Sequence, residues 1–198
     1  MAEAQTFLLV GLGNPGDKYE STRHNVGFWV TDELAKSWGC VFTGEKWEAQ
    51  IGRGQRCGAS LILIKPHTYM NLSGRAVQPC AHFYKVAPDH IIVLHDDLDM
   101  PLGRLKLVFG GGAGGHKGIQ SITQLLGSSD YYRMKICIGR PGTDGISEVI
   151  PIERFVLSPF SADALHLLRQ RFVHIGEGLE FLFSGQSAKA FNLINSCK

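Results

Sequence analysis

The chain has 198 residues, of which 44% are hydrophobic and 19% are charged, and its formal net charge at pH 7 is +2. This length allows one sizeable core but not two ordinary domains, so we expect a single globular domain over residues 1–198. The small net charge does not by itself indicate a nucleic-acid-binding protein, and no stretch approaches the ~20 apolar residues of a membrane span. Five scattered cysteines without paired spacing predict reduced thiols in a cytoplasmic protein, rather than a disulfide framework or a zinc site.

Predicted strands and helices alternate along the chain. The apolar run 7–10 ends at Gly11 and is typical of a buried strand, and apolar residues at helical spacing predict a helix from Val26 to about Leu34, capped by Gly39. Further strands are predicted at 50–52, 60–64, 91–94, 104–109 and 133–138, and further helices at 76–86, 119–126, 162–183 and 188–194. This alternation predicts a three-layer α/β/α fold: a single domain with a twisted, mostly parallel or mixed sheet and helices on both faces.

The loop after the first strand, residues 11–16, has the spacing G-x-G-x-x-G of a dinucleotide-binding loop. In that class of site a helix opens at the glycines and points its N-terminus at the pyrophosphate. Here Pro15 and the polar residues 17–23 delay the first helical periodicity, and the acidic residues Asp32 and Glu33 fall inside the predicted helix instead of after a second strand. The sequence therefore disfavours a nicotinamide or flavin enzyme, which remains an alternative.

His24 lies at the entrance to the first predicted helix, and Asp96 follows a predicted central strand. A carboxylate beside an imidazole fixes its tautomer and stabilises the imidazolium, so a pair of His24 and Asp96 could take a proton from water at neutral pH. The loops contain no G-x-S-x-G elbow and no cysteine, so the sequence indicates no nucleophilic side chain. These residues predict direct attack by a water molecule that His24 activates.

The acidic run Asp96, Asp97 and Asp99 has an alternative interpretation as a magnesium site for phosphoryl transfer. No second acidic cluster lies in the neighbouring loops, which offer amides, histidine and lysine instead. We therefore expect Asp97 and Asp99 to form a polar turn that leads to Pro101 and Gly103, and we predict no metal site.

Two further clusters offer groups that bind anions or a carbonyl oxygen. The glycine-rich loop 110–115 precedes a predicted helix, where backbone N–H groups can approach a ligand closely, and the Asn71 side chain can donate to a developing oxyanion. From Arg104 to Arg140 there are six basic residues and one acidic residue, so this stretch has a local charge of 6 − 1 = +5. On charge alone, such a stretch is typical of an ordinary solvated face.

Several separated motifs, in order, resemble those of the bacterial-type peptidyl-tRNA hydrolase family. They are Gly-Leu-Gly-Asn-Pro-Gly at 11–16, Tyr19, Thr-Arg-His-Asn at 22–25, Tyr-Met-Asn-Leu-Ser-Gly at 69–74, His-Asp-Asp-Leu-Asp at 95–99, Gly-Gly-His at 114–116 and Ala-Lys-Ala-Phe-Asn at 188–192. The resemblance extends from the first strand to the last helix. It implies a single α/β domain, a monomer without a cofactor, and hydrolysis of the ester between a peptide and the terminal ribose of tRNA.

The resemblance also implies roles for individual residues. It implies that His24 is the general base, that Asp96 holds it ready to accept a proton, and that Asn71 binds substrate and water. It further implies that Asn14 distinguishes a blocked aminoacyl group from a free one. Tyr19 and Tyr69 look like contacts to the 3′ end of the tRNA, and the basic stretch would meet phosphates of the acceptor stem.

The chain departs from the family pattern at two positions. Lys117 stands where the family usually has a substrate-contacting Asn, and lysine keeps a donor but loses the acceptor and adds charge. Val108 occupies a position where a phosphate-binding lysine is expected, which leaves Lys135, with Lys106 nearby, as the candidates. These departures keep open an alternative function, an RNA-binding relative that has the fold with little or no activity.

Overall fold

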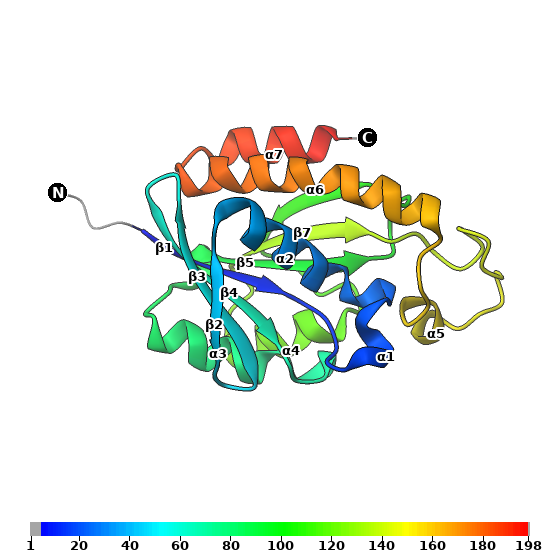
Figure 1. Ribbon diagram of the computed structural model, residues 1–198, viewed down its shortest axis with the longest axis horizontal. Helices are drawn as coiled ribbons and strands as arrows, with labels where there is room; N and C mark the ends of the chain where they lie inside the picture. Colours follow the sequence, from blue (N-terminus) through cyan, green and yellow to red (C-terminus); the bar gives the residue numbers. More distant parts are fainter. Residues whose placement is uncertain (1–4, 198) are drawn as a thin grey trace.

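A seven-stranded sheet runs through the middle of the molecule (Figure 1). The computed structural model describes residues 5–197. The strand order is β2-β3-β4-β1-β5-β7-β6, in which β4, β1, β5 and β7 are parallel, whereas β2, β3 and β6 add antiparallel pairings at the two edges. The bounds are β1 (Thr6–Gly11), β2 (Val41–Glu45), β3 (Ala49–Arg56), β4 (Ala59–Pro66), β5 (Ile91–Asp97), β6 (Leu105–Phe109) and β7 (Tyr132–Cys137).

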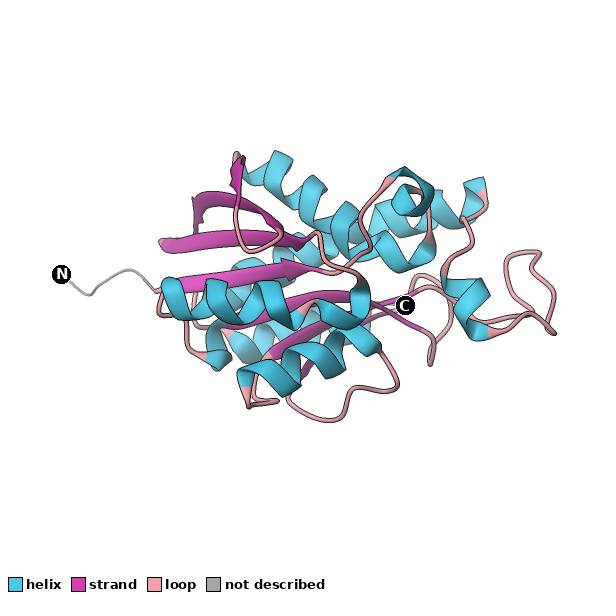
Figure 2. Ribbon diagram, turned by 90° about the horizontal axis from the view of Figure 1, so that it is seen from below, coloured by secondary structure: helices cyan, strands magenta, loops and turns pink. Residues whose placement is uncertain are grey.

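Helices cover both faces of this sheet (Figure 2). The helices of one face are α2 (Val26–Trp38), α6 (Ala162–Phe183) and α7 (Ser187–Ser196), and those of the other are α3 (Gly74–Phe83) and α4 (Lys117–Leu126). Two short helices, α1 (Asp17–Glu20) and α5 (Ile152–Val156), lie beyond the carboxyl-terminal ends of the strands (Figure 1). Single 3-10 turns are η1 (Arg23–Asn25), η2 (Met70–Leu72) and η3 (Pro88–His90). The predicted mixed α/β/α fold is confirmed.

The central strand β1 contributes to both cores. Phe7 and Leu9 pack with α2, α6 and α7, whereas Leu8 and Val10 pack with α3 and α4, because successive side chains of a strand point to opposite faces. All four side chains are buried. A strand covered on both faces needs an apolar residue at every position, which explains the uninterrupted run in the sequence.

Most predicted elements are present, with shifted ends. The helix predicted at 162–183 has these bounds in the structure, and Gly39 ends α2 in the left-handed conformation (φ 66°), as predicted. β5 was expected to end at residue 94 but continues to Asp97, because His95, Asp96 and Asp97 all pair with β7. Pairing with a neighbouring strand here outweighs the low intrinsic strand preference of aspartate. Asp96 is therefore held by the sheet and not by a loop.

Three elements were not predicted. β2 is an edge strand without a buried residue, so it has no apolar alternation to read. α1 and α5 have four and five residues, which is shorter than the window in which a helical period becomes visible. α3 begins at Gly74 and ends at Phe83, so it lies slightly earlier in the chain than the predicted range 76–86.

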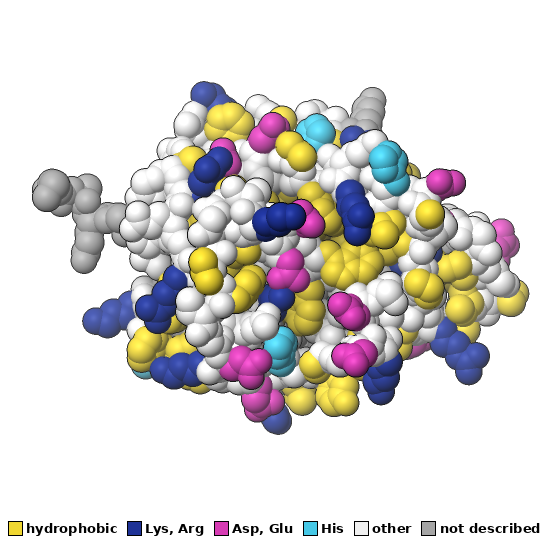
Figure 3. Space-filling view, viewed as in Figure 1, with side chains coloured by type: hydrophobic (Ala, Val, Ile, Leu, Met, Phe, Trp, Pro, Cys, Tyr) yellow, Lys and Arg dark blue, Asp and Glu magenta, His cyan; other side chains and the backbone are white. Residues whose placement is uncertain are grey.

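The face formed by α2 and α6 carries an apolar hollow with charged side chains of both signs around it (Figure 3). Trp29 of α2 and Leu165 and Phe172 of α6 line it. None of the helices within residues 5–197 combines the length and the apolar character that crossing a membrane requires.

Candidate active site

The residues predicted to carry chemistry gather at the carboxyl-terminal ends of the parallel strands. Asn14 follows β1, Asn71 lies in η2 after β4, and Asp96 is the second-last residue of β5. His24 is the middle residue of η1, directly before α2. Functional groups of open α/β sheets collect at this edge because the connecting loops leave the strands there.

His24 and Asp96 form the predicted pair. His24 Nδ1 lies 2.8 Å from Asp96 Oδ1, and the side chains are 14% and 3% exposed. With Nδ1–H donated to the carboxylate, Nε2 carries the lone pair, and it has no hydrogen-bond partner among residues 5–197. This is the tautomer that a general base needs, because the free nitrogen can accept a proton while the other is anchored.

The same contact sets the protonation of both groups. Burial lowers the pKa of His24, but the charge and hydrogen bond of Asp96 outweigh this effect, so the His24 pKa lies above its ordinary value of 6.5. Lys117 opposes this increase weakly by repulsion. Burial raises the pKa of Asp96, but attraction to His24 and His116 and their hydrogen bonds hold that pKa well below its usual range. Asp96 is therefore a carboxylate at neutral pH.

His116 belongs to the same cluster, and sequence reasoning quoted it in a motif without giving it a role. Its Nε2 lies 2.9 Å from Asp96 Oδ1, the oxygen that also binds His24. Its Nδ1 accepts a hydrogen bond from the Ile119 N–H at 3.4 Å, because His116 is the N-cap of α4. A histidine at a helix entrance is the signal that drew attention to His24, and it could have identified His116 too.

His95 supports this cluster from the core. Its side chain is buried, its ring lies 4.8 Å from that of His116, and its Nδ1 is 2.8 Å from the Asp96 carbonyl oxygen. Burial, followed by repulsion from His116, holds the pKa of His95 well below 6.5, so the ring is neutral. From the sequence, residue 95 was placed after the strand and its ring was given no role in the site, although it lies within β5.

Asn14 is fixed between two of the 3-10 turns. Its backbone N–H donates to Asn25 Oδ1 (2.8 Å), and Asn25 Nδ2 donates back to the Asn14 carbonyl oxygen (3.0 Å). The Asn14 side-chain oxygen accepts from the Met70 N–H at 2.8 Å, so its Nδ2 is the group left for a ligand. Through Asn14, these hydrogen bonds connect Asn25 of η1 with Met70 of η2, the two turns that also carry His24 and Asn71.

The glycines of 11–16 do not form a dinucleotide-binding loop. The element that follows them is α1, which has four residues, so no long helix opens there. A side chain at Gly11 would place its Cβ 2.1 Å from Thr31 Oγ1 and 2.6 Å from the Gly27 carbonyl oxygen. This glycine is therefore needed for close packing of β1 against α2, and the alternative of a nicotinamide or flavin enzyme has no structural support.

The acidic run does not assemble into one cluster. Asp97 Oδ2 lies 2.5 Å from Lys135 Nζ, and Asp99 pairs with Arg140 at 2.7 Å. Asp97 Oδ1 also accepts from the Asp99 N–H (2.9 Å), so the predicted polar turn is present. The metal-ligating types that meet are instead Asp96 with two imidazoles, a set unlike the oxygen ligands that Mg²⁺ prefers.

Comparison with known proteins decides the family. The family model described as peptidyl-tRNA hydrolase matches residues 8–198. The chain belongs to the peptidyl-tRNA hydrolase family. The chain is 48% identical over 192 residues to the peptidyl-tRNA hydrolase of Desulfotalea psychrophila, covering 97% of this chain and 98% of that one. It is 40% identical over 190 residues to the enzyme of Neisseria gonorrhoeae, covering 96% of each.

Solved structures of peptidyl-tRNA hydrolases have the same fold. The crystal structure of the enzyme from Acinetobacter baumannii is 36% identical, with a TM-score of 0.90, and the match covers 100% of this chain and 99% of that one. Its Arg119Gln mutant gives the same TM-score at 37% identity and covers 100% and 98%. The resemblance inferred from the sequence motifs is therefore confirmed.

The three other residues expected to contact substrate, Tyr69, Asn71 and Tyr19, differ in exposure. Tyr69 is 55% exposed, and Asn71 is exposed and has no side-chain hydrogen bond within the described chain. Tyr19 in α1 is half-buried, with Lys18 Nζ 4.8 Å from the centre of its ring. Asn71 and Tyr69 therefore present a carboxamide and an aromatic ring to solvent, and Tyr19 presents part of a second ring.

The three lysines expected to contact tRNA differ in exposure and in whether an ion pair already engages them. Lys106 of β6 and Lys135 of β7 lie directly opposite each other, but Lys106 is exposed whereas Lys135 is engaged by Asp97. Lys117, the first residue of α4, is exposed and follows His116 in the chain. Val108 is half-buried on the same strand as Lys106.

The basic stretch is less available than its charge suggested. Arg104 donates to the carbonyl oxygens of Cys197 and Asn195 at 2.5 and 2.6 Å. Arg133 is buried and donates to the carbonyl oxygens of Gly110 and Gly112, which fixes the glycine-rich loop. Two of the six basic residues therefore hold the chain together, and the free charge is carried by Lys106 and Lys117.

Proposed function

We propose that the protein hydrolyses the ester between a peptide and the terminal ribose of tRNA, with His24 as the general base. The observation that carries this proposal is the geometry of His24, whose Nδ1 is anchored on Asp96 and whose Nε2 is free. Within the described chain, no serine, threonine or cysteine side chain hydrogen-bonds to His24. Water is therefore the nucleophile rather than a side chain.

In the first step, His24 Nε2 takes a proton from water while the water oxygen forms a bond to the ester carbonyl carbon. The charge on the imidazolium that results is stabilised by the ionised Asp96 carboxylate. The carbonyl oxygen becomes an oxyanion, and the Asn71 carboxamide is the donor that we assign to it. In the second step, the ester C–O bond breaks and His24 returns the proton to the ribose oxygen. The products are a peptide with a free carboxylate and a tRNA with a free 3′ end.

The fixed orientation of Asn14 suits a role in selecting the substrate. Its oxygen is already occupied by the Met70 N–H, so it offers only the Nδ2 donor. A donor binds the carbonyl oxygen of a peptide bond but not the protonated amine of a free aminoacyl group. We propose that Asn14 distinguishes peptidyl-tRNA from aminoacyl-tRNA in this way.

The tRNA itself would lie across the exposed residues around the pair. The rings of Tyr19 and Tyr69 offer stacking surfaces for unpaired bases of the 3′ end. Lys106 and Lys117 offer free ammonium groups for phosphates of the acceptor stem, with Lys135 adding charge beside Asp97. We propose a monomer in the cytoplasm, a reducing compartment that suits the five free cysteines.

Turnover of a defined substrate tests this proposal. The purified protein is incubated with N-acetylated aminoacyl-tRNA and, in parallel, with the same aminoacyl-tRNA without the acetyl group. We expect release of N-acetyl amino acid and intact tRNA from the first substrate, and much slower release from the second. Binding of both tRNAs without hydrolysis of either would instead establish the RNA-binding relative.

A further inference from the structure

The three side chains of η1 are each bound to a different segment of the chain. His24 binds Asp96 of β5, and Asn25 binds the backbone of Asn14 after β1. Arg23 binds residues of the segment 138–161, which follows β7. A single turn of three residues therefore connects three separate segments, and the position of His24 depends on all of them.

Arg23 is the most deeply held of the three. Its side chain is 0% exposed, and its guanidinium donates to the Ile138 carbonyl oxygen (3.0 Å) and to Ser158 Oγ (3.2 Å). The guanidinium also forms an ion pair with the Asp144 carboxylate. In addition, the backbone N–H of Arg23 donates to the Ser158 carbonyl oxygen at 3.0 Å. Every one of these partners lies in the segment 138–161.

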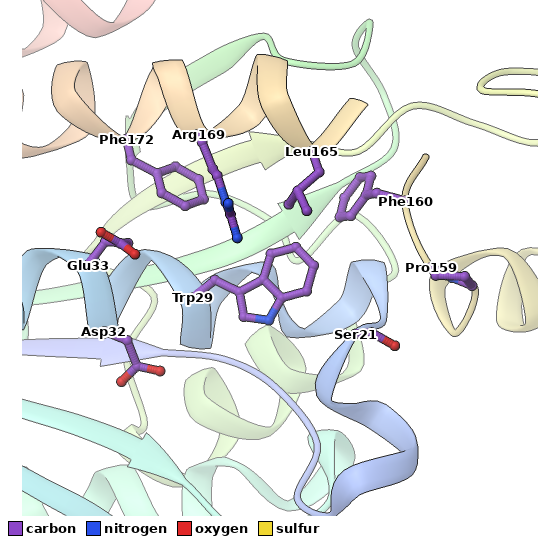
Figure 4. Close-up of a pocket in the computed structure, with 9 residues that line it drawn as sticks. All are labelled: Ser21, Trp29, Asp32, Glu33, Pro159, Phe160, Leu165, Arg169 and Phe172. Carbon is purple, nitrogen blue, oxygen red and sulfur yellow. The ribbon is translucent and has the colours of Figure 1, made fainter. Parts of the chain in front are cut away.

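Two aromatic rings enclose the guanidinium. The Arg23 carbon Cζ lies 4.6 Å from the centre of the Phe155 ring and 4.5 Å from that of Phe160. Phe160 in turn packs against Trp29 of α2 at 5.6 Å, and both line a hollow of about 330 Å³ (Figure 4). The Trp29 indole N–H donates to the Glu20 carbonyl oxygen at 2.9 Å. The packing around Arg23 thus extends to both sides of η1, from α1 to α2.

Asp144 completes this arrangement at a conformational cost. It adopts the left-handed backbone conformation (φ 54°), which favours glycine, and it lies between Gly142 and Gly145. Its carboxylate binds Arg23 and also accepts from the Ser161 hydroxyl and backbone N–H, where α6 begins. Burial raises the pKa of Asp144, but the hydrogen bonds from Ser161 and Arg23 hold it below the usual range. The carboxylate is therefore ionised.

We propose that Arg23 and Asp144 are positioning residues for the general base: they hold η1 against segment 138–161 and so keep the His24 imidazole on Asp96. Arg23 is fully buried, so it acts through its neighbour and not on the substrate. Displacements of about 1 Å in a catalytic group cost on the order of 100-fold in rate, so anchoring of the adjacent residue affects the rate directly. This inference rests on His24 being the general base.

The test removes the Asp144 carboxylate without straining the backbone. Asp144→Gly suits the left-handed conformation, so the fold is expected to persist. Its matched control is Asp163→Gly, which removes an exposed carboxylate without a partner in the described chain from the first turn of α6. The measurements are kcat and KM for peptidyl-tRNA and the His24 pKa from NMR titration of its ring protons.

We expect Asp144→Gly to lower kcat by about tenfold, through loss of orientation, with little change in KM. We also expect the His24 pKa to decrease, because contact with Asp96 is what raises it. The other charged or titratable groups that face His24 are His116, the N-cap of α4, and Lys117, its first residue, and both are unchanged in this variant. Asp163→Gly should leave kcat and the His24 pKa unchanged although glycine weakens the helix.

An unchanged kcat in folded Asp144→Gly overturns the proposal. A loss of kcat with an unchanged His24 pKa also overturns it, because the loss then does not arise from the position of His24.

Arg23→Lys gives an independent test, since it keeps the charge for Asp144 but cannot reproduce the contacts to Ile138 and Ser158. It should give an intermediate loss of kcat with the same direction of pKa change. If His24 is not the general base, the NMR titration still shows whether Arg23 and Asp144 position its ring. Failure of the positioning proposal can therefore be distinguished from failure of the proposed function.

Discussion

His24 Nδ1 lies 2.8 Å from Asp96 Oδ1, and this contact determines which ring nitrogen is available to water. The carboxylate that fixes the ring is almost fully buried and receives a second hydrogen bond from His116. Asp96 thus fixes the orientation of the His24 ring and supplies the negative charge that stabilises its protonated form. The pKa of His24 therefore depends on how the charge of this carboxylate is shared between the two imidazoles.

Asp96→Asn should reduce kcat by less than removal of His24 does, and it should shift the acidic limb of the rate profile downward. Asp96 raises the pKa of His24, so an uncharged amide lets that pKa decrease, and the base stays neutral to lower pH. A pH profile of kcat over pH 5 to 8 measures the shift. An acidic limb that moves upward would contradict the assignment of Asp96 as the stabilising charge.

His116→Ala should move the acidic limb in the opposite direction. Without the hydrogen bond from His116 Nε2, the Asp96 carboxylate interacts more strongly with the imidazolium of His24 and raises its pKa further. The same kcat profile, recorded beside that of Asp96→Asn, distinguishes the two effects by their sign. If the acidic limbs of His116→Ala and Asp96→Asn shift in the same direction, the Asp96 carboxylate is not shared between His24 and His116.

Lys117→Asn should increase KM and reduce its salt dependence by about one phosphate contact. The ammonium group also repels a protonated His24, so its removal should shift the acidic limb slightly upward. Lys36→Asn is a matched control, because Lys36 is exposed on α2 and its ammonium group has no hydrogen-bond or ion-pair partner in the described chain. If Lys117→Asn changes neither quantity, this side chain points to solvent and its departure from the family pattern has no effect.

Exhaustive chelation should leave the rate unchanged, because the mechanism uses only side chains and water. The measurement is turnover after dialysis against a chelator, with intact tRNA verified separately. The three ligand-type atoms of His24, Asp96 and His116 lie within 4.8 Å of one another, so the cluster merits this test. Activity that disappears and returns with added magnesium would revive the metal alternative for the acidic run.

The sequence predicted the sheet and its helices well where burial leaves a recognisable apolar pattern. β1 is buried on both faces and shows an uninterrupted apolar run, whereas α6 buries one face and repeats its apolar residues at the helical period. β2 and α5 could not be predicted in this way, because an exposed edge strand and a single helical turn carry no such period.

The candidate site shows the same division. His24 and Asp96 could be paired from the sequence, because residues that follow parallel strands meet at one edge of the sheet. The role of His116 depends on the path of the glycine-rich loop that Arg133 fixes, and this path cannot be read from local sequence. The contact between Arg23 and Asp144 spans 121 residues, so no local pattern could have indicated it.

The central claim is that His24 takes the proton from the attacking water. Single-turnover hydrolysis of N-acetylated aminoacyl-tRNA by His24→Ala tests it most directly, with tRNA binding measured on the same preparation. We expect a loss of about 100- to 10,000-fold in the hydrolysis rate, which is the contribution of a general base, together with unchanged tRNA binding. Near-normal hydrolysis by His24→Ala would contradict it.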